Sequence, residues 1–323
     1  MLIRMKSIVK KIPAVQWMYR QLTKANPLSL YLYSMKPVLA RGIISLLRKT
    51  VHFEALTITS SDCIVDTGTA KFYWEPGNAY SMLGYPFRGD FEKTETDITV
   101  KIASSARCVV DVGGNFGWFA CQWQAVMPAG SQLHVFEPVP AERSRLQKNL
   151  ALNTRNDVTT IVNDVCLSEA PGEVQLHIPK KLGAAFASMS EQSYGGEFEV
   201  VTARSTTLDD YCKNRQLDHI DLLKIDVEGA ELLVLRGART ILQAAAKPVI
   251  LIESQASTIE TFGSTVPEVL NFIKSLGYRG FVFQKDRLQE LTDRNIETGY
   301  NYLFVDEQKA GSIRSFLEKK LTV

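Results

Sequence analysis

Residues 109–119 read VVDVGGNFGWF, an apolar run followed by a glycine-bearing turn and the start of a helix. Twenty residues after Gly117, Glu137 follows a second apolar run at residues 133–136. A buried strand, a tight turn, a helix, a second strand and an acidic residue come in the order that builds a nucleotide pocket. The stretch therefore predicts an α/β fold with a nucleotide site at this turn.

The glycine spacing distinguishes two kinds of nucleotide site. A dinucleotide turn, GxGxxG, would need glycine at position 115 and a small residue at position 118, but the chain has Asn115 and Trp118. The pattern DxGxNxG, formed by Asp111, Gly113, Asn115 and Gly117, resembles motif I of class I methyltransferases, which bind S-adenosylmethionine (SAM). For this segment alone, a plain strand-to-helix turn stays open, with glycines that only supply positive φ.

Length and composition are those of an ordinary globular protein. The chain has 323 residues, of which 45% are hydrophobic and 22% charged, and this suggests one large or two modest domains. The five cysteines form no CxxC or Cys/His cluster, so neither structural zinc nor disulfides are expected and a cytoplasmic location is predicted. Residues 112–136 carry no formal charge, but five glycines or prolines argue against a membrane span.

Charge is unevenly distributed along the chain. Residues 1–53 contain ten Lys or Arg and no Asp or Glu, which leaves 27 basic and 35 acidic residues for the rest. Apolar residues recur at helical spacing in this segment. It is predicted to be a basic amphipathic helical arm, which either contacts an anionic membrane at the inner face or packs on the body. No nucleic-acid partner is expected, because no recognition motif accompanies the charge.

Three parts are predicted: the arm at 1–53, a small β-rich region at 54–105 and a Rossmann-like SAM-binding domain at 106–323. From about residue 106, strands and helices alternate, which predicts a parallel sheet with helices on both faces. The predicted strands number seven, as in the class I methyltransferase sheet, and lie near 108–112, 133–137, 158–163, 220–225, 248–253, 280–284 and 302–305. The predicted helices lie near 117–127, 140–152, 229–244, 266–276 and 312–321.

A second motif lies at residues 220–231, IDLLKIDVEGAE, where an apolar strand ends in a cluster of charge and a helix begins near Gly229. Ligands of open α/β sheets gather at the carboxyl ends of strands, so Asp226 is predicted to lie beside the nucleotide pocket. The alternative is helix capping by Asp226 or Glu228, with Lys224 simply paired to a carboxylate. For Glu231, an acid in the first helical turn, capping is the preferred interpretation.

These motifs together resemble the FkbM-type methyltransferases. The resemblance covers about residues 105 to 255 and rests on residues 110–117, 136–138, 148–153, 165–168, 206–209, 224–231 and 251–253. One departure concerns the fifth strand, because family members often carry a histidine where this chain has Gln255. The resemblance implies SAM-dependent methyl transfer, usually to a hydroxyl oxygen of a sugar, polysaccharide or secondary metabolite.

The resemblance also implies cofactor-binding roles for six residues. The methionine end of SAM would be lined by Asp111, Gly113, Asn115 and Gly117. The ribose would be held by Glu137, and the adenine amino group would be contacted by Asp164. For Asp164, an ordinary turn aspartate is a nearly equal alternative.

Methyl transfer to an alcohol requires alignment of donor and acceptor and a base that takes the hydroxyl proton. Asp226 and Glu253 are the predicted catalytic residues, because both should project from adjacent strand ends, where two close carboxylates push the pKa of one of them upward. A divalent metal held by the same pair is an alternative ranked second.

On the acceptor side, Ser188, His177 and Glu228 are the candidate substrate-binding residues. Residues 182–196 are rich in small side chains and are predicted to form a lid over the acceptor or a surface connection. The preferred function is a SAM-dependent O-methyltransferase acting on a sugar, polysaccharide or glycolipid. N- or O-methylation of a small natural product and a non-catalytic SAM-binding scaffold at a membrane stay open.

Overall fold

The computed structural model describes residues 56–58, 63–73, 91–180, 186–191, 196–284, 287–296 and 298–309. The predicted arm at 1–53 and the predicted helix near 312–321 lie outside these residues. The chain divides into two compact units, Met1–Lys93 and Thr94–Val323. The three-part division at 53 and 105 stays a prediction. Within the part that the structure describes, no helix has the length and apolar character needed to cross a membrane.

The first unit contains a small antiparallel sheet of three strands. These are β1 Leu56–Ile58, β2 Cys63–Asp66 and β3 Lys71–Tyr73, paired in that order. A tight turn joins β2 to β3, in which the Thr67 hydroxyl accepts a hydrogen bond from the Ala70 amide at 3.0 Å. These three strands agree with the β-rich character predicted for this part of the chain.

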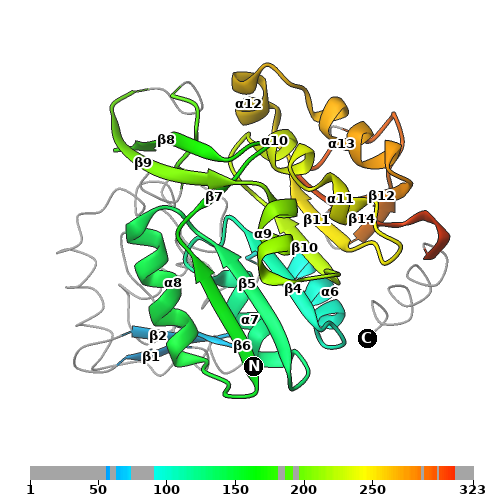
Figure 1. Ribbon diagram of the computed structural model, residues 1–323. Coiled ribbons are helices and arrows are strands. Elements are labelled where there is room, and N and C mark those ends of the chain that lie inside the picture. The colour runs from blue at the N-terminus through cyan, green and yellow to red at the C-terminus, as the bar shows by residue number, and fades with distance from the viewer. Residues whose placement is uncertain are drawn as a thin grey trace, which may run out of the picture. The chain divides into compact units, whose positions relative to one another are not determined.

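The second unit is built on an eight-stranded sheet with the order β13-β12-β14-β11-β10-β4-β5-β6 (Figure 1). Strands β6, β5, β4, β10 and β11 are parallel, and β14 pairs antiparallel with both β11 and β12. The Rossmann-like fold is confirmed, with β13 as an eighth strand beyond the predicted seven. The bounds are β4 Cys108–Val112, β5 Ser131–Phe136, β6 Val158–Asn163, β10 Leu222–Ile225, β11 Val249–Glu253, β12 Tyr278–Gln284, β13 Arg287–Glu290 and β14 Asn301–Asp306.

Helices cover both faces of this sheet. On one face, α6 Lys93–Ala103, α7 Trp118–Val126 and α8 Pro140–Leu152 lie together. The indole of Trp118 donates to the Thr96 hydroxyl at 2.9 Å and so joins α7 to α6. The opposite face is covered by α9 Leu208–Arg215, α10 Glu231–Arg236, α11 Arg239–Leu242 and α13 Val266–Ser275, while α12 Ala256–Ile259 and the 3₁₀ turn Glu260–Phe262 follow β11.

The prediction of a single helix over 229–244 is wrong. Glu228 and Gly229 have φ angles of 55° and 108°, so the helix cannot begin before Glu231. Ala238, with φ −115° and ψ 11°, departs from helical geometry and separates α10 from α11. The chain therefore spends several residues after β10 in a loop that lies at the carboxyl edge of the sheet.

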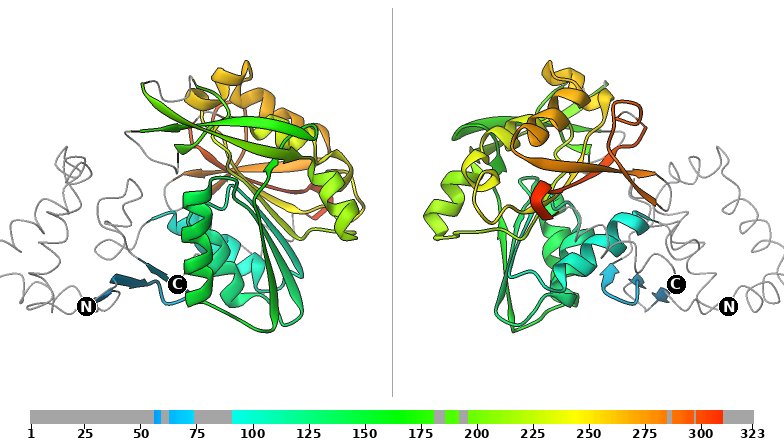
Figure 2. Two further views of the ribbon diagram at one scale, coloured as in Figure 1. Left: turned by 60° about the vertical axis from the view of Figure 1, so that its left-hand side comes forward. Right: turned by 90° about the vertical axis from the view of Figure 1, so that its right-hand side faces the viewer.

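Residues 182–196 lie between β segments, as the sequence indicates, but it was not predicted that these form a separate sheet of order β7-β9-β8, with β7 Cys166–Leu167, β8 Gly172–Pro179 and β9 Phe198–Thr206. Strands β8 and β9 form a long antiparallel hairpin that stands apart from the main sheet (Figure 2). Residues 181–185 and 192–195 between them lie outside the described residues.

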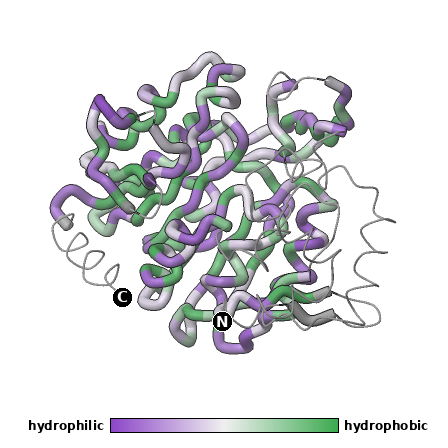
Figure 3. Tube along the Cα trace, turned by 180° about the vertical axis from the view of Figure 1, so that it is seen from behind, coloured by the Kyte–Doolittle hydropathy of each residue, from purple (hydrophilic) through white to green (hydrophobic). Residues whose placement is uncertain are grey.

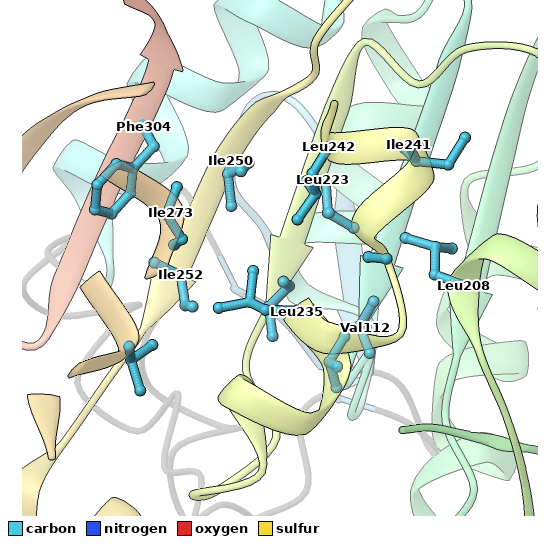
Figure 4. Packing of buried hydrophobic residues seen from close by; sticks show 14 of the residues in the cluster. Val112, Leu208, Leu223, Leu235, Ile241, Leu242, Ile250, Ile252, Ile273 and Phe304 are labelled. Carbon is cyan, nitrogen blue, oxygen red and sulfur yellow. The ribbon is translucent and has the colours of Figure 1, made fainter. Parts of the chain in front are cut away.

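The core explains why the central strands were predictable. Every residue of β4 and β10 except the buried Asp111 and Lys224 is apolar, and all are buried. Hydrophobic residues concentrate along these strands (Figure 3), and the sheet packs through Leu223 and Ile250 against α10, α11 and α13 (Figure 4). Parallel strands covered on both faces read as continuous apolar runs. Each buried aliphatic side chain stabilises the fold by roughly 1.5–3 kcal/mol.

Candidate active site

The candidate site lies where the strand order reverses. Strand β4 is followed in the chain by β5 on one side, and β10 flanks it on the other. In open α/β sheets, ligands bind at the carboxyl ends of the strands at such a point. There the Asp226 amide donates to the Val112 carbonyl at 3.0 Å. Gly113 has φ +80°, and a Cβ on it would lie 1.8 Å from the Asp226 carbonyl oxygen, so only glycine lets the two loops touch.

The backbone amides of the turn after β4 are satisfied within the protein. Each of the five donates a hydrogen bond: Gly113 and Gly114 to the Phe136 carbonyl, Asn115 to Glu137 Oε2, Phe116 to Asn115 Oδ1 and Gly117 to the Gly114 carbonyl. A dinucleotide turn needs such amides for its phosphates. The turn therefore fits a nucleoside ligand without phosphate, as the spacing of the predicted motif I residues indicates.

Glu137 is held at the carboxyl end of β5 by backbone amides. Its Oε1 accepts from Val139 and its Oε2 from Asn115, both at 2.8 Å. The side chain is buried, and burial raises the pKa of its carboxyl to about 7. The ribose contact expected of this carboxylate stays a prediction. Asp164, which follows β6, is instead 58% exposed and forms an ion pair with Arg204 at 3.3 Å.

Asp111, the first motif I residue, is buried beneath the turn. It is 1% exposed and is the register partner of Lys224 on β10. Burial raises the pKa of its carboxyl to about 6, against the attraction of Lys224, whose Nζ lies 3.6 Å from Asp111 Oδ1. Gly117, at the end of the turn, has φ +91° and Asn115 has φ 51°.

The two predicted catalytic carboxylates come together. Ile225 on β10 pairs with Ile252 on β11, so Asp226 and Glu253 stand side by side at adjacent strand ends. Burial, and then the charge of Asp226, raises the pKa of Glu253 to about 8. The side-chain amide of Gln255, at the position of the family histidine, donates to Glu253 Oε1.

The same row of the sheet contains residues that sequence reasoning missed. Asn301, the first residue of β14, is the register partner of Glu253. Its side-chain amide donates to Glu95 Oε1 on α6 at 3.1 Å, and burial raises the pKa of Glu95. A polar residue opening the last strand was a signal for Asn301. Glu95 gave no signal, because α6 itself was not predicted.

The three predicted substrate-binding residues also meet. His177 on β8 and Ser188 exchange two backbone hydrogen bonds, of 2.7 and 3.1 Å. The Ser188 hydroxyl donates to the Glu228 carbonyl at 2.8 Å, which ties the β8–β9 hairpin to the loop after β10. The His177 ring lies edge-on to Phe198, with ring centroids 5.9 Å apart.

Glu231 is an acidic residue in the first turn of α10, as predicted, and its side chain accepts hydrogen bonds from the preceding loop. Its Oε1 accepts from the Gly229 amide at 3.0 Å, at the start of α10. The residue is 2% exposed, and burial raises the pKa of its carboxyl to about 7. Among the residues that the structure describes, no group of three or more His, Cys, Asp and Glu side chains is arranged to hold a metal ion.

The sheet order and the polar turn at its switch point define a class I methyltransferase. Residues 111–279, just over half of the chain, match the methyltransferase FkbM domain. The protein therefore belongs to the FkbM methyltransferase family and is a SAM-dependent methyltransferase, with SAM as its cofactor.

The chain is similar to two curated relatives and to one solved structure. Methyltransferase sdnD of Sordaria araneosa is 30% identical over 210 residues, which cover 56% of this chain and 78% of sdnD. The 2-O-methyltransferase NoeI of Sinorhizobium fredii (strain NBRC 101917 / NGR234) is 29% identical over 149 residues, 42% of this chain and 58% of NoeI. The crystal structure of methyltransferase FkbM from Methylobacillus flagellatus KT has a TM-score of 0.39 at 20% identity, covering 62% of this chain and 44% of that chain.

Proposed function

We propose that the enzyme transfers the methyl group of SAM to a hydroxyl oxygen of a sugar, polysaccharide or glycolipid. The observation that carries this proposal is the pair of partly buried carboxylates, Asp226 and Glu253, at adjacent strand ends. An alcohol must lose its proton during or just after attack, and a base with a pKa near the working pH serves this step best. The similarity to NoeI, a 2-O-methyltransferase, supports oxygen as the accepting atom.

The cofactor side is formed by the residues around the turn after β4. When bound, SAM supplies a methyl group that its sulfonium already activates. Asn115 and Gly117 line the methionine end together with Gly113, above the buried Asp111. Glu137 accepts hydrogen bonds from the ribose hydroxyls through the oxygen lone pairs that its two backbone amides leave free. Asp164 is assigned to the adenine amino group.

On the acceptor side, Glu253 takes the proton of the attacking hydroxyl, and Asp226 orients that hydroxyl. Burial favours the neutral form of Glu253, so the ionised carboxylate is a stronger base than an exposed glutamate. Ser188, His177 and Glu228 contact the rest of the acceptor. Their mutual hydrogen bonds support this assignment, because they connect the hairpin to the loop that contains Asp226.

The test is transfer of labelled methyl from SAM onto an array of glycans, lipids and small metabolites, followed by location of the methyl group. Asp226→Asn and Glu253→Gln should keep SAM affinity, measured by calorimetry, and lose about 10²- to 10⁴-fold in rate. Glu169→Gln, which breaks an exposed ion pair with Arg236, is the control. A methyl group found only on nitrogen or on a small natural product would refute the proposed acceptor.

We further propose that residues 1–53 hold the enzyme at an anionic inner membrane face, within the cytoplasm. Ten basic residues without an acidic one support this contact. Binding of the full chain to anionic liposomes should weaken as salt rises. Equal binding to neutral and anionic liposomes would contradict it.

A further inference from the structure

A buried ammonium group joins the two sides of the candidate site. The side chain of Lys224 is 6% exposed. Its Nζ donates to the Asp226 carboxylate at 3.0 Å and to the Gly113 carbonyl at 3.2 Å, and it lies 3.6 Å from Asp111 Oδ1. Two of the ammonium's three donors thus serve Asp226 and Gly113, and Asp111 Oδ1, beyond hydrogen-bond distance, interacts with the ammonium through charge.

The three oxygens belong to different parts of the site. Gly113 lies in the turn on the cofactor side, Asp226 lies on the acceptor side, and Asp111 lies in β4 beneath both. We propose that Lys224 is a positioning residue for methyl transfer, which fixes the Asp226 carboxylate relative to the Gly113 turn. Lys224 thereby determines the direction in which the acceptor approaches the methyl donor. This inference rests on the proposed function, in which Asp226 orients the acceptor hydroxyl.

Charged groups from several elements surround Lys224. Asp111 comes from β4, Asp226 follows β10, Glu253 ends β11, and Glu231 on α10 interacts with Asp226 and Glu253. Helix α7 contributes the Phe119 ring, whose centroid lies 5.4 Å from Nζ. Burial raises the pKa values of Asp111 and Glu253, and Lys224 opposes that rise in both. Removal of the cation should therefore raise both pKa values further.

The opposite edge of the sheet provides a matched control. Lys247, just before β11, has its Nζ 3.8 Å from Asp306 Oδ1 and 3.3 Å from the Gly277 carbonyl. The Tyr278 ring centroid lies 5.3 Å away. A carboxylate, a carbonyl and an aromatic ring thus surround both lysines, but the neighbours of Lys247 are not candidate site residues. Lys247→Met removes the same chemistry away from the site.

The experiment compares Lys224→Met with Lys247→Met in the full chain, with an acceptor that the wild type methylates. For Lys224→Met we expect kcat to fall by about 10- to 100-fold, because in-line transfer is sensitive to small misplacements. Its pH–rate profile should move to higher pH. The SAM dissociation constant, measured by calorimetry without acceptor, should change by less than about tenfold. Lys247→Met should lower the melting temperature and leave kcat and the pH profile unchanged.

Two further variants keep the test decisive if Lys224→Met does not fold. Loss of one partner from a buried ion pair leaves an uncompensated charge. The double variant Lys224→Met/Asp111→Asn removes the buried carboxylate as well and should retain the low kcat and the shifted profile. Lys224→Arg keeps the cation and should recover part of kcat.

A readout without turnover comes from NMR titration of ¹³C-labelled carboxyl groups in the unliganded protein. Glu253 should titrate at higher pH in the Lys224→Met or double variant than in the wild type. Wild-type kcat and an unshifted titration in a folded variant that lacks Lys224 would overturn the inference. Methylation of nitrogen by the wild type would refute the proposed acceptor instead, and the effects of Lys224 could still be measured with that acceptor.

Discussion

The pKa values of carboxyl groups shift in opposite directions at the two edges of the main sheet. The carboxyl edge is where the parallel strands end, and the amino edge is where they begin. At the carboxyl edge, Glu137, Glu231 and Glu253 are largely buried, and burial raises their pKa values to about 7, 7 and 8. At the amino edge, Asp157 and Asp218 precede β6 and β10, and hydrogen bonds from neighbouring arginine and histidine side chains lower their pKa values. Buried carboxyl groups with raised pKa values therefore gather at the edge where such sheets bind ligands.

The largest difference between the edges should appear in a pair of glycine variants. Gly113 and Gly130 have φ angles of +80° and +79°, so alanine is strained at both. A Cβ at Gly113 would lie 1.8 Å from the Asp226 carbonyl, whereas the nearest atom to one at Gly130 is Arg107 Nη1 at 3.9 Å. Gly113→Ala should cost about 2–5 kcal/mol of unfolding free energy and abolish SAM binding, and Gly130→Ala about 1–2 kcal/mol.

Urea unfolding and SAM calorimetry measure both effects. Gly130→Ala is the control, since it carries the same strain at the amino edge and should bind SAM as the wild type does. Similar losses of stability and affinity in the two variants would mean that the contact between the two loops has no special role.

The second difference concerns pH. If Glu253 accepts the hydroxyl proton, its pKa of about 8 predicts that the rate rises roughly tenfold between pH 7 and pH 9. Stability should change in the opposite direction. The folded pKa values of Glu137, Glu231 and Glu253 lie above the ordinary value, so folding binds protons, and stability falls as pH rises from about 5 through 8.

Rate and melting temperature measured across this range test the argument. The melting temperature should fall by at least about 4 °C between pH 5 and pH 8.5. In Glu253→Gln the fall should be smaller, because one of the titrating groups is gone. Stability that increases steadily from pH 5 to pH 8.5 would show that these carboxyl groups are ionised at ordinary pH.

The contrast between the edges also explains what could be predicted from sequence. The strands β4, β10 and β11 are largely buried and mostly apolar, so their ends, and with them Asp226 and Glu253, stood out. The hairpin of β8 and β9 did not, because one of its faces is exposed and polar residues interrupt its pattern. Helix α6 has six β-branched residues among eleven, a composition that favours strands.

The missing parts of the site depend on pairings between distant residues. Asn301 and Glu95 meet across 206 positions in sequence, and the register of β14 against β11 decides that Asn301 faces Glu253. Lys224 was visible as a charge in a strand, but its contact with Gly113 exists only once β4 and β10 lie side by side. No local pattern contains this information.

A third prediction isolates a structural carboxylate at the amino edge. Asp221 Oδ2 accepts hydrogen bonds from the Arg107 amide at 2.7 Å and the Cys108 amide at 2.9 Å, which fixes the start of β4 against β10. Asp221→Ala should lower the unfolding free energy by about 1 kcal/mol, because the bonds are partly exposed to solvent. The KM for SAM should stay at the wild-type value, and a large rise in KM would show that the edges are coupled.

The smallest effect concerns Asp164, which lies at the carboxyl edge but is exposed like the carboxyl groups of the amino edge. Asp164→Ala and Arg204→Ala break the same exposed ion pair, so each should change stability by less than about 1 kcal/mol. If Asp164 also contacts the adenine amino group, SAM binding should weaken in Asp164→Ala alone. The SAM dissociation constant should then rise about fivefold in Asp164→Ala and stay unchanged in Arg204→Ala. Equal SAM affinities in the two variants would show that Asp164 is an ordinary turn residue. Only the buried carboxyl groups of the carboxyl edge would then have a role in function.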